Sequence, residues 1–258
     1  MIKKIKCLFM TALLVLGATT ISIAQEESSS YKMWESIILT PDNTKLKILG
    51  ENMRKHNQKY HAKGSAHEAV VYSITSGPNS GKLVWEMGPI TFSDLDTRPA
   101  EGGHDEDWRD NVMPYIKKMG TIEYWKQMDD LSNVSMLDED NSKYPILYLR
   151  YYEVAKGHGY SIQHLLKQMS DAVKAMDGEN PWGLYDNQLR QGFDIGRHIA
   201  WVSFFKNWTE FDVDGNFKDA FLKANGENSW DAYLKGLDDT FSNSWDEIWV
   251  YDKELSGN

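Results

Sequence analysis

Short runs of alternating hydrophobic and polar residues, separated by stretches with helical spacing, divide the chain into two halves of similar order. Alternation over a few residues is typical of a half-buried strand, whereas apolar positions three or four apart predict a helix. In the first half, strands are predicted at 33–40, 67–75, 82–87 and 121–128, and helices at 41–61 and 107–118. In the second half, strands are predicted at 146–154, 182–190, 198–205 and 247–252, and helices at 161–176 and 230–243.

Short sequence matches between the halves indicate an internal repeat. The clearest is a turn, because residues 76–82 and 191–197 both contain two glycines four positions apart, followed by a basic residue. Each turn lies between two predicted strands, so its glycines are expected where a hairpin needs positive φ. Further matches, in the same order, pair 92–96 with 208–212 and 123–125 with 247–249. We therefore predict a tandem duplication, with repeats at 33–132 and 146–258 joined by a polar linker at 133–145.

Each half has the order β-α-β-β-α-β of the ferredoxin-like unit, whose four-stranded antiparallel sheet carries helices on one face only. Two such units in one chain can cover each other's open faces. The features that the halves share include the hairpin Val70-Val71-Tyr72-Ser73-Ile74, Gly77, Gly81 and Val84-Trp85-Glu86. With these, the chain resembles the dimeric α/β-barrel superfamily, which includes antibiotic-biosynthesis-type monooxygenases and NIPSNAP-like proteins. The resemblance implies an α+β fold of two tandem ferredoxin-like units packed sheet to sheet as an intrachain α/β barrel around a cavity.

Alternation along the strands predicts which side chains face that cavity. In 146–154, the mostly apolar row Leu147, Leu149 and Tyr151 is expected to meet the helices. The opposite row, Tyr148, Arg150 and Tyr152, would then point inward. By the same reasoning, five further side chains are expected to point inward: Trp34, Glu123, Trp125, Glu247 and Trp249. A concave aromatic site with a few polar groups is the usual form of a small-molecule pocket, in which Arg150 would hold a carboxylate or phenolate. The alternative is an internal ion pair that only neutralises buried charge.

The first 24 residues have the pattern of a cleavable bacterial secretory signal. Lys3, Lys4 and Lys6 precede an apolar run from Cys7 to about Ile23, and Ala24 ends a small-residue exit. The strongly apolar part of that run is too short to span a bilayer, which takes about 20 residues. We therefore expect an exported, periplasmic or extracellular protein, with a disordered segment at 25–32. Cys7 is the single cysteine, so a mature chain would hold no disulfide and no thiolate metal site.

Charge and aromatic content narrow the expected partners. The formal net charge is -10, and loss of the three signal lysines would make it about -13, which disfavours nucleic acids and anionic membranes. The 10 Trp, 13 Tyr and 9 Phe residues must be largely buried or line a pocket. The expected partner is a small aromatic or apolar molecule, and the expected state is a monomer or a weak homodimer.

Seven histidines remain as candidates for metal or proton chemistry. His56 and His61 are five apart, so on one helix they would not share a face as an i, i+4 zinc pair does, and no HxxxH or HExxH spacing occurs. These two, like His67 and His104, are interpreted as isolated surface residues, and no metal site is predicted. His198, at the start of a strand, is a candidate proton-transfer group. A haem-containing relative would instead imply that it is a haem ligand; no cofactor is otherwise predicted.

Familiar catalytic motifs are absent from the sequence. It contains no GxSxG, Walker loop or GxGxxG, and residues 212–216 lack the Gly and Glu spacing of a calcium loop, so they are predicted to form a polar turn before a helix. Three functions remain open. The first is an exported protein that binds a small molecule between its two sheets. The others are a cofactor-independent oxygenase or isomerase of the same fold, and a structural module without a ligand.

Overall fold

The computed structural model describes residues 31–99, 102–137, 140–189 and 197–257. Tyr31–Asn258 form one compact unit, so both predicted repeats belong to the same folded body. The predicted signal, and most of the segment predicted to be disordered at 25–32, lie outside the described residues. Among the described residues, no helix is long and apolar enough to cross a membrane.

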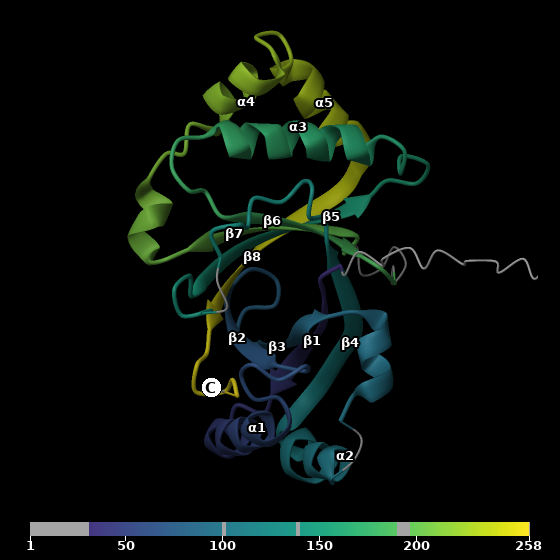
Figure 1. Ribbon diagram of the computed structural model, residues 1–258, viewed down its shortest axis with the longest axis vertical. Coiled ribbons are helices and arrows are strands. Elements are labelled where there is room, and N and C mark those ends of the chain that lie inside the picture. Colours follow the sequence, from purple (N-terminus) through teal and green to yellow (C-terminus); the bar gives the residue numbers. More distant parts are fainter. Residues whose placement is uncertain (1–30, 100–101, 138–139, 190–196, 258) are drawn as a thin grey trace, which may run out of the picture. The chain divides into compact units, whose positions relative to one another are not determined.

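Eight antiparallel strands form the centre of this unit, with helices on two outer sides (Figure 1). The strands are β1 (Met33–Pro41), β2 (Ala69–Ser76), β3 (Leu83–Ile90), β4 (Ile116–Gln127), β5 (Ile146–Val154), β6 (Trp182–Asn187), β7 (Ile199–Phe205) and β8 (Phe241–Tyr251). The helices are α1 (Leu46–Tyr60), α2 (His104–Asp107), α3 (Ile162–Ala175), α4 (Phe217–Asn225) and α5 (Trp230–Thr240). In Figure 1, α1 and α2 lie outside β1 to β4, whereas α3, α4 and α5 lie outside β5 to β7.

The strands close into a barrel in the order β1-β3-β2-β8-β5-β7-β6-β4. Within it, the first half has the order β4-β1-β3-β2 and the second half has the equivalent order β8-β5-β7-β6. The halves meet at two edges, where β2 pairs with β8 and β4 pairs with β6. Closure leaves neither four-stranded sheet with an unpaired edge. The predicted fold class, an intrachain barrel of two ferredoxin-like units, is confirmed.

Most predicted elements are found within a few residues of their expected bounds, and the strand at 146–154 coincides with β5. The first helix begins at Leu46 and not near Pro41, because the Asp42 carboxylate accepts hydrogen bonds from the backbone N–H and hydroxyl of Thr44 and forms a turn. The second helix of the first half, predicted at 107–118, lies a few residues earlier. The four residues of α2 continue directly into a π-helical turn, Trp108–Val112, and a short 3₁₀ segment, Met113–Tyr115. Pro114, which has no N–H to donate, lies in that last segment, just before β4.

The segments that match between the halves fold in similar ways. Residues 92–96 and 208–212 both lie in short 3₁₀ segments, Phe92–Thr97 and Trp208–Asp212. In the first turn, Gly77 and Gly81 have φ of +97° and +83°, as predicted for a hairpin that needs positive φ. The second turn, with Gly192 and Gly196, lies outside the described residues. The duplication itself stays a prediction.

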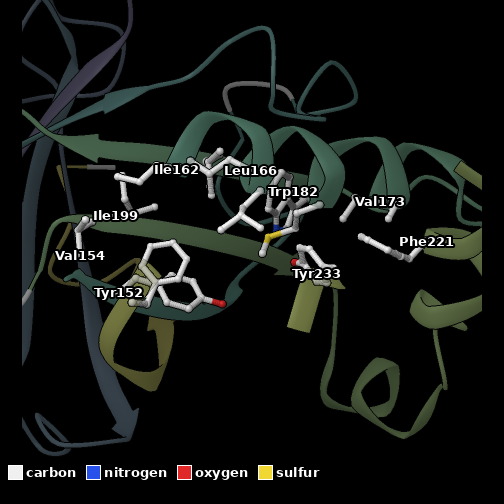
Figure 2. Close-up of a cluster of buried hydrophobic side chains, with 14 residues drawn as sticks. Tyr152, Val154, Ile162, Leu166, Val173, Trp182, Ile199, Phe221 and Tyr233 are labelled. Atoms are coloured by element: carbon white, nitrogen blue, oxygen red, sulfur yellow. The ribbon is translucent and has the colours of Figure 1, made fainter. Parts of the chain in front are cut away.

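Three hydrophobic clusters fill the unit, and each lies on one face of the barrel wall. The first joins α3, α4 and α5 to the outside of the second half, where α3 residues such as Leu166 and Val173 pack over strand residues such as Ile199 (Figure 2). The second joins α1 to the outside of the first half through Leu49 and Met53. The third, which includes Ile38, Tyr72, Trp125, Leu147 and Trp249, lies inside the barrel.

The faces of β5 are the reverse of the prediction. Leu147, Leu149 and Tyr151 belong to the interior cluster, whereas Tyr152 packs in the cluster beneath α3 and α5. The register explains this, since Leu147 lies opposite Trp249 on β8 and cross-strand partners share a face. The apolar row was assigned to the helices, but the inside of a closed barrel is also hidden from water. Tyr148, Arg150 and Tyr152 therefore lie on the outer face and not in the cavity.

Candidate functional site

A cavity of about 700 Å³ lies inside the barrel. Its aromatic lining consists of Trp34, Tyr72, Trp125, Tyr151, Tyr185, Phe204 and Trp249. Aliphatic side chains such as Leu147 and Leu149 fill the wall between these rings, and segments near Gly64 and Leu137 border one end. Because most of its surface is apolar and only a few polar groups reach it, the cavity has the character of a site for a small organic molecule.

Two glutamates border the cavity: Glu68, which accepts a hydrogen bond from the backbone N–H of Gly64, and Glu86, in the middle of β3. The neighbours of Glu86 across the strands are Ser36 and Val70. Burial raises the pKa of Glu86 to about 7, while a hydrogen bond from Ser36 and the charge of Arg197 oppose the rise. The side chain is partly accessible because it faces the cavity. Glu86 can therefore give or take a proton near neutral pH.

Two more carboxylates are fully buried, in matching positions of the two halves. Glu123 on β4 accepts a hydrogen bond from Trp125 Nε1 at 3.0 Å, and Glu247 on β8 accepts one from Trp249 Nε1 at 2.8 Å. Their remaining partners differ. Arg197 contacts Glu123 through Nε at 3.1 Å and through its terminal nitrogen at 2.9 Å, whereas the amide nitrogen of Asn79 donates to Glu247 at 2.6 Å.

Arg197 is the buried arginine of this site. Its guanidinium also lies 5.2 Å from the ring centre of Tyr151, a cavity residue. Burial raises the pKa of Glu123, and the charge of Arg197 opposes that rise. The sequence interpretation chose Arg150 in this role and missed Arg197, although Arg197 is the basic residue that ends the second glycine turn. Its position directly after the second glycine of the repeated turn was the signal in the sequence that could have identified it.

The other predicted site residues divide into two groups. Trp34, Trp125 and Trp249 line the cavity, and Glu123 and Glu247 lie buried beside Trp125 and Trp249, on the inner side of the barrel wall. Tyr148, Arg150, Tyr152 and His198 are not among the residues that line the cavity.

Arg150 forms a two-pronged ion pair with Asp246 on the outer face of the barrel, at 2.6 and 2.8 Å, and also donates to the hydroxyl of Tyr148. Tyr152 packs against Phe241 with ring centres 4.3 Å apart. The prediction that Arg150 points into the barrel and binds a ligand there is therefore wrong, because its side chain lies on the outer face.

His198 is buried, and its Nδ1 accepts a hydrogen bond from the backbone N–H of Val154 at 3.0 Å. The described residues that line the cavity include no histidine, cysteine or methionine, and of the common axial ligands of haem they offer only the tyrosines Tyr72, Tyr151 and Tyr185.

The histidines predicted to be isolated on the surface are buried, and three of them meet. His56, His61 and His104 converge where α1 ends and α2 begins, and their candidate ligand nitrogens all lie within 4.8 Å of one another. The prediction failed because His61 is the first residue after α1, with φ -134° and ψ 32°. The chain turns there, so the five-residue spacing on a helix does not apply. Burial lowers the pKa of His56, and it lowers that of His61 to about 3.

Comparison with known proteins places the fold. No protein-family model and no curated protein sequence matches the chain. Among solved structures, a candidate monooxygenase from Lactobacillus acidophilus is 14% identical, with a TM-score of 0.53 over 86% of this chain and 95% of that one. A candidate monooxygenase from Fusobacterium nucleatum is 8% identical, with a TM-score of 0.53 over 86% and 93%. A chlorite dismutase variant from Candidatus Nitrospira defluvii is 9% identical, with a TM-score of 0.51 over 86% and 94%. At these identities the likeness concerns architecture alone: the chain has a ferredoxin-like α/β-barrel fold.

Proposed function

We propose that this protein binds a small, mostly apolar aromatic molecule with one ionisable hydroxyl group inside its barrel, and that Glu86 exchanges the hydroxyl proton. The observation that supports this proposal most directly is a carboxyl group with a pKa of about 7 in the wall of an aromatic cavity. The cavity volume of about 700 Å³ falls within the usual range for small-molecule sites, about 300–1,000 Å³.

The cavity wall suits such a ligand for two reasons. Trp34, Trp125 and Trp249 offer ring faces and edges against which a flat ligand can pack, and Tyr185 adds a further ring. A phenolic or enolic hydroxyl would donate to the Glu86 carboxylate, and a hydrogen bond to a charged acceptor stabilises a complex by about 1.5–3 kcal/mol. A ligand that lacks the hydroxyl would leave that carboxylate without this donor. The proposal therefore predicts different affinities for two ligands of nearly the same shape, one with the hydroxyl group and one without it.

Isothermal titration calorimetry with 2-naphthol and its methyl ether, 2-methoxynaphthalene, tests this discrimination. We expect 2-naphthol to bind about 10- to 100-fold more tightly, and we expect Glu86→Met to abolish the preference without abolishing binding of the ether. Glu153→Met is the matched control, because Glu153 also lies on a strand but is not among the residues that line the cavity. An unchanged preference in Glu86→Met would refute the role of Glu86. Failure of both probes to bind would favour the structural module without a ligand.

A cofactor-independent oxygenase is the second candidate, and a base in the cavity wall with a pKa of about 7 favours it. Glu86 would take the hydroxyl proton, and molecular oxygen would then oxidise the phenolate to a quinone. One oxygen atom would replace a ring hydrogen as the new carbonyl, and the other would leave as water with that hydrogen and the proton returned by Glu86. Two of the structural neighbours are candidate monooxygenases, but the argument here depends on Glu86 and not on their likeness of fold. An oxygen electrode separates the two functions, because an oxygenase consumes oxygen in proportion to added substrate and Glu86→Met would stop this. Binding without oxygen consumption would leave the binding function.

We also propose that the protein acts after export, as a monomer or a weak homodimer. The support is the basic, apolar and small-residue pattern of the first 24 residues. N-terminal sequencing of the protein from a periplasmic extract should find Gln25 as the first residue. A chain that keeps Met1 and stays with the cytoplasmic fraction would refute the proposal.

A further inference from the structure

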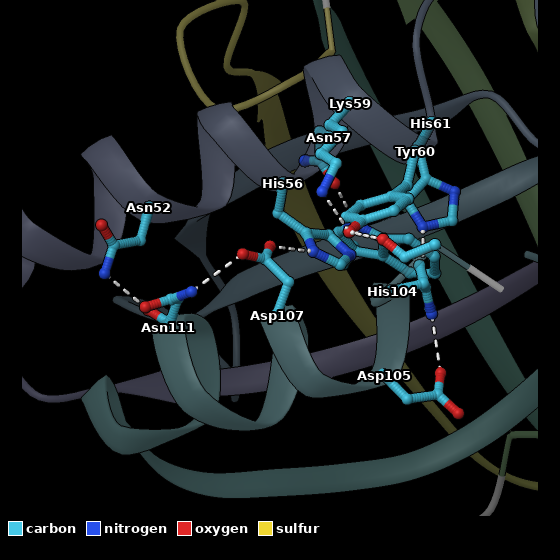
Figure 3. Close-up of polar contacts among 12 residues, drawn as sticks. Asn52, His56, Asn57, Lys59, Tyr60, His61, His104, Asp105, Asp107 and Asn111 are labelled. Atoms are coloured by element: carbon cyan, nitrogen blue, oxygen red, sulfur yellow. Dashed lines mark hydrogen bonds and ion pairs between the residues drawn. The ribbon is translucent and has the colours of Figure 1, made fainter. Parts of the chain in front are cut away.

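Three buried histidines lie against one another at the outer side of the first half. None of them is among the residues that line the cavity. His56 comes from the last turn of α1, His61 follows that helix, and His104 begins α2 (Figure 3). Their exposed fractions are 1%, 0% and 7%. The ring centres lie 4.9 Å apart for His56 and His104, 5.4 Å for His56 and His61, and 5.2 Å for His61 and His104.

Each ring has an acceptor at its Nδ1 atom. His56 Nδ1 lies 2.8 Å from the Asp107 carboxylate, His104 Nδ1 lies 2.7 Å from the Asp105 carboxylate, and His61 Nδ1 lies 2.8 Å from the backbone carbonyl of His67. A carbonyl or an ionised carboxylate only accepts, so each Nδ1 must carry the hydrogen. In a neutral imidazole, each Nε2 then presents a lone pair. This arrangement, with the second ring nitrogen held by a carboxylate or carbonyl, is typical of metal-binding histidines.

The three Nε2 atoms are the part of the cluster that no protein partner explains. His61 Nε2 and His104 Nε2 are 3.1 Å apart, so two lone pairs face each other. His56 Nε2 is the one buried side-chain nitrogen or oxygen atom, among the described residues, that has no hydrogen-bond partner. The His56 side chain is fully buried, so bulk water does not reach that nitrogen.

A shared proton is the simplest alternative to a metal ion. It would bridge His61 and His104, but it would place a positive charge in a buried position and would still leave His56 Nε2 without a partner. A metal ion accepts all three lone pairs at once. With zinc–nitrogen bonds of about 2.0–2.1 Å in a tetrahedral site, neighbouring nitrogens lie about 3.3 Å apart, close to the separation seen for His61 and His104.

We propose that His56, His61 and His104 bind one divalent transition-metal ion, zinc, through their Nε2 atoms. Three imidazoles suit zinc and disfavour magnesium and calcium, which prefer oxygen ligands. Asp105 and Asp107 orient the rings and are not themselves ligands. The remaining coordination position is left for a water molecule.

The surroundings indicate a structural role for the ion. The rings of Trp85, Trp108 and Tyr60 pack against the three histidines. α2 has only four residues and continues into a π-helical turn, Trp108–Val112, and a short 3₁₀ segment, so this short helical run has little stability of its own. Bound zinc would tie α2 to the end of α1 and so hold this segment against the barrel.

Untagged full-length protein, grown with zinc and dialysed, should contain about one equivalent of zinc by mass spectrometry. After removal of the metal by a chelator, Co²⁺ should restore one equivalent with the visible absorption of a tetrahedral nitrogen site. Saturating zinc should raise the Tm of the metal-free protein by about 10 °C. His56→Gln and His104→Gln should abolish the Co²⁺ spectrum, and Asp107→Asn should weaken zinc binding by about 10- to 100-fold.

Two histidine variants are the controls. His164→Gln alters an exposed histidine on α3. His67→Gln alters a buried one next to the cluster, whose Nε2 is already hydrogen-bonded to the carbonyl of Asp94. Both should keep one equivalent of metal. The proposal is overturned if the wild type takes up neither zinc nor Co²⁺, or if His56→Gln and His104→Gln retain full binding. If the glutamine variants do not fold, the Asp107→Asn affinity decides, because an unchanged value would also overturn it.

Discussion

The carboxyl group of Glu86 should make the protein less stable as the pH rises, and Glu86→Gln should remove that dependence. Burial raises the pKa of Glu86 from its ordinary value of 4.5 to about 7 in the folded protein. Glutamine has nearly the shape of a protonated glutamate and no charge at any pH. The variant should therefore behave like wild-type protein whose Glu86 never ionises.

The sign follows from proton binding. Between pH 4.5 and about 7, Glu86 holds its proton in the folded protein and has lost it in the unfolded chain, so the free energy of unfolding falls as the pH rises through this window. Each pKa unit corresponds to about 1.4 kcal/mol, which gives about 3 kcal/mol for the whole window. Water in the cavity would solvate the partly accessible carboxylate, so we expect a loss of about 1–3 kcal/mol.

Urea unfolding, followed by tryptophan fluorescence, measures this loss. At about pH 5 the two proteins should differ by less than about 1 kcal/mol, and at about pH 8 Glu86→Gln should be the more stable by about 1–3 kcal/mol. Glu153→Gln, which changes a carboxylate outside the cavity lining, should keep the pH dependence of the wild type. Parallel pH profiles for wild type and Glu86→Gln would refute the reasoning, as would a variant that is less stable at about pH 8.

Arg197→Met should lower the free energy of unfolding by about 3–5 kcal/mol, because it leaves the buried Glu123 carboxylate without its partner. Adding Glu123→Gln should recover most of that loss in a double-mutant cycle, and no recovery would contradict the pairing. Gly77→Ala should destabilise the protein more than Gly81→Ala, as measured by Tm. Both residues have positive φ, but only at Gly77 would a Cβ atom lie 2.3 Å from a backbone oxygen, that of Asp246. Equal losses would show that backbone strain alone matters.

The architecture could be predicted because its signals are local. Alternation over a few residues marked the strands, and two glycines four apart marked the first hairpin. The order of the elements then allowed few arrangements, and the observed barrel is the one that the ferredoxin-like order implies. Where a local signal was overlooked, the bounds were misplaced: Pro114 lies inside the helix expected at 107–118, and the helical run ends at Tyr115.

The orientation of β5 could not be read from alternation alone. Alternation divides a strand into two rows, but it does not say which row faces the interior. For a sheet with one face in water, the apolar row identifies the buried face. In this closed barrel both faces of β5 are covered, with Leu149 inside and Tyr152 beneath the helices. Pairing with β8 decides the orientation, and that pairing joins residues about a hundred positions apart.

The histidine cluster depends on a long-range contact and on one residue at a helix end. His104 is 43 positions from His61, and nothing in the sequence near either residue indicates that they meet. Had α1 continued one residue further, the rings of His56 and His61 would point to different sides of the helix. The helix ends at Tyr60, so a spacing that argues against a metal pair within a helix becomes compatible with one.

The two halves of the barrel share a motif but differ in the charge placed beside it. Each half buries a glutamate that accepts from the tryptophan two residues later on the same strand, at 3.0 Å in β4 and 2.8 Å in β8. An amide completes the shell of Glu247, and a guanidinium completes that of Glu123. Among the described residues, Arg197 is thus the positive charge that acts on all three carboxyl groups Glu86, Glu123 and Glu247. Arg197 contacts Glu123 directly but acts on Glu86 through charge alone, so it offsets only part of the cost of burying Glu86. Because Glu86 borders the cavity, burial places its exchangeable proton where a ligand would meet it.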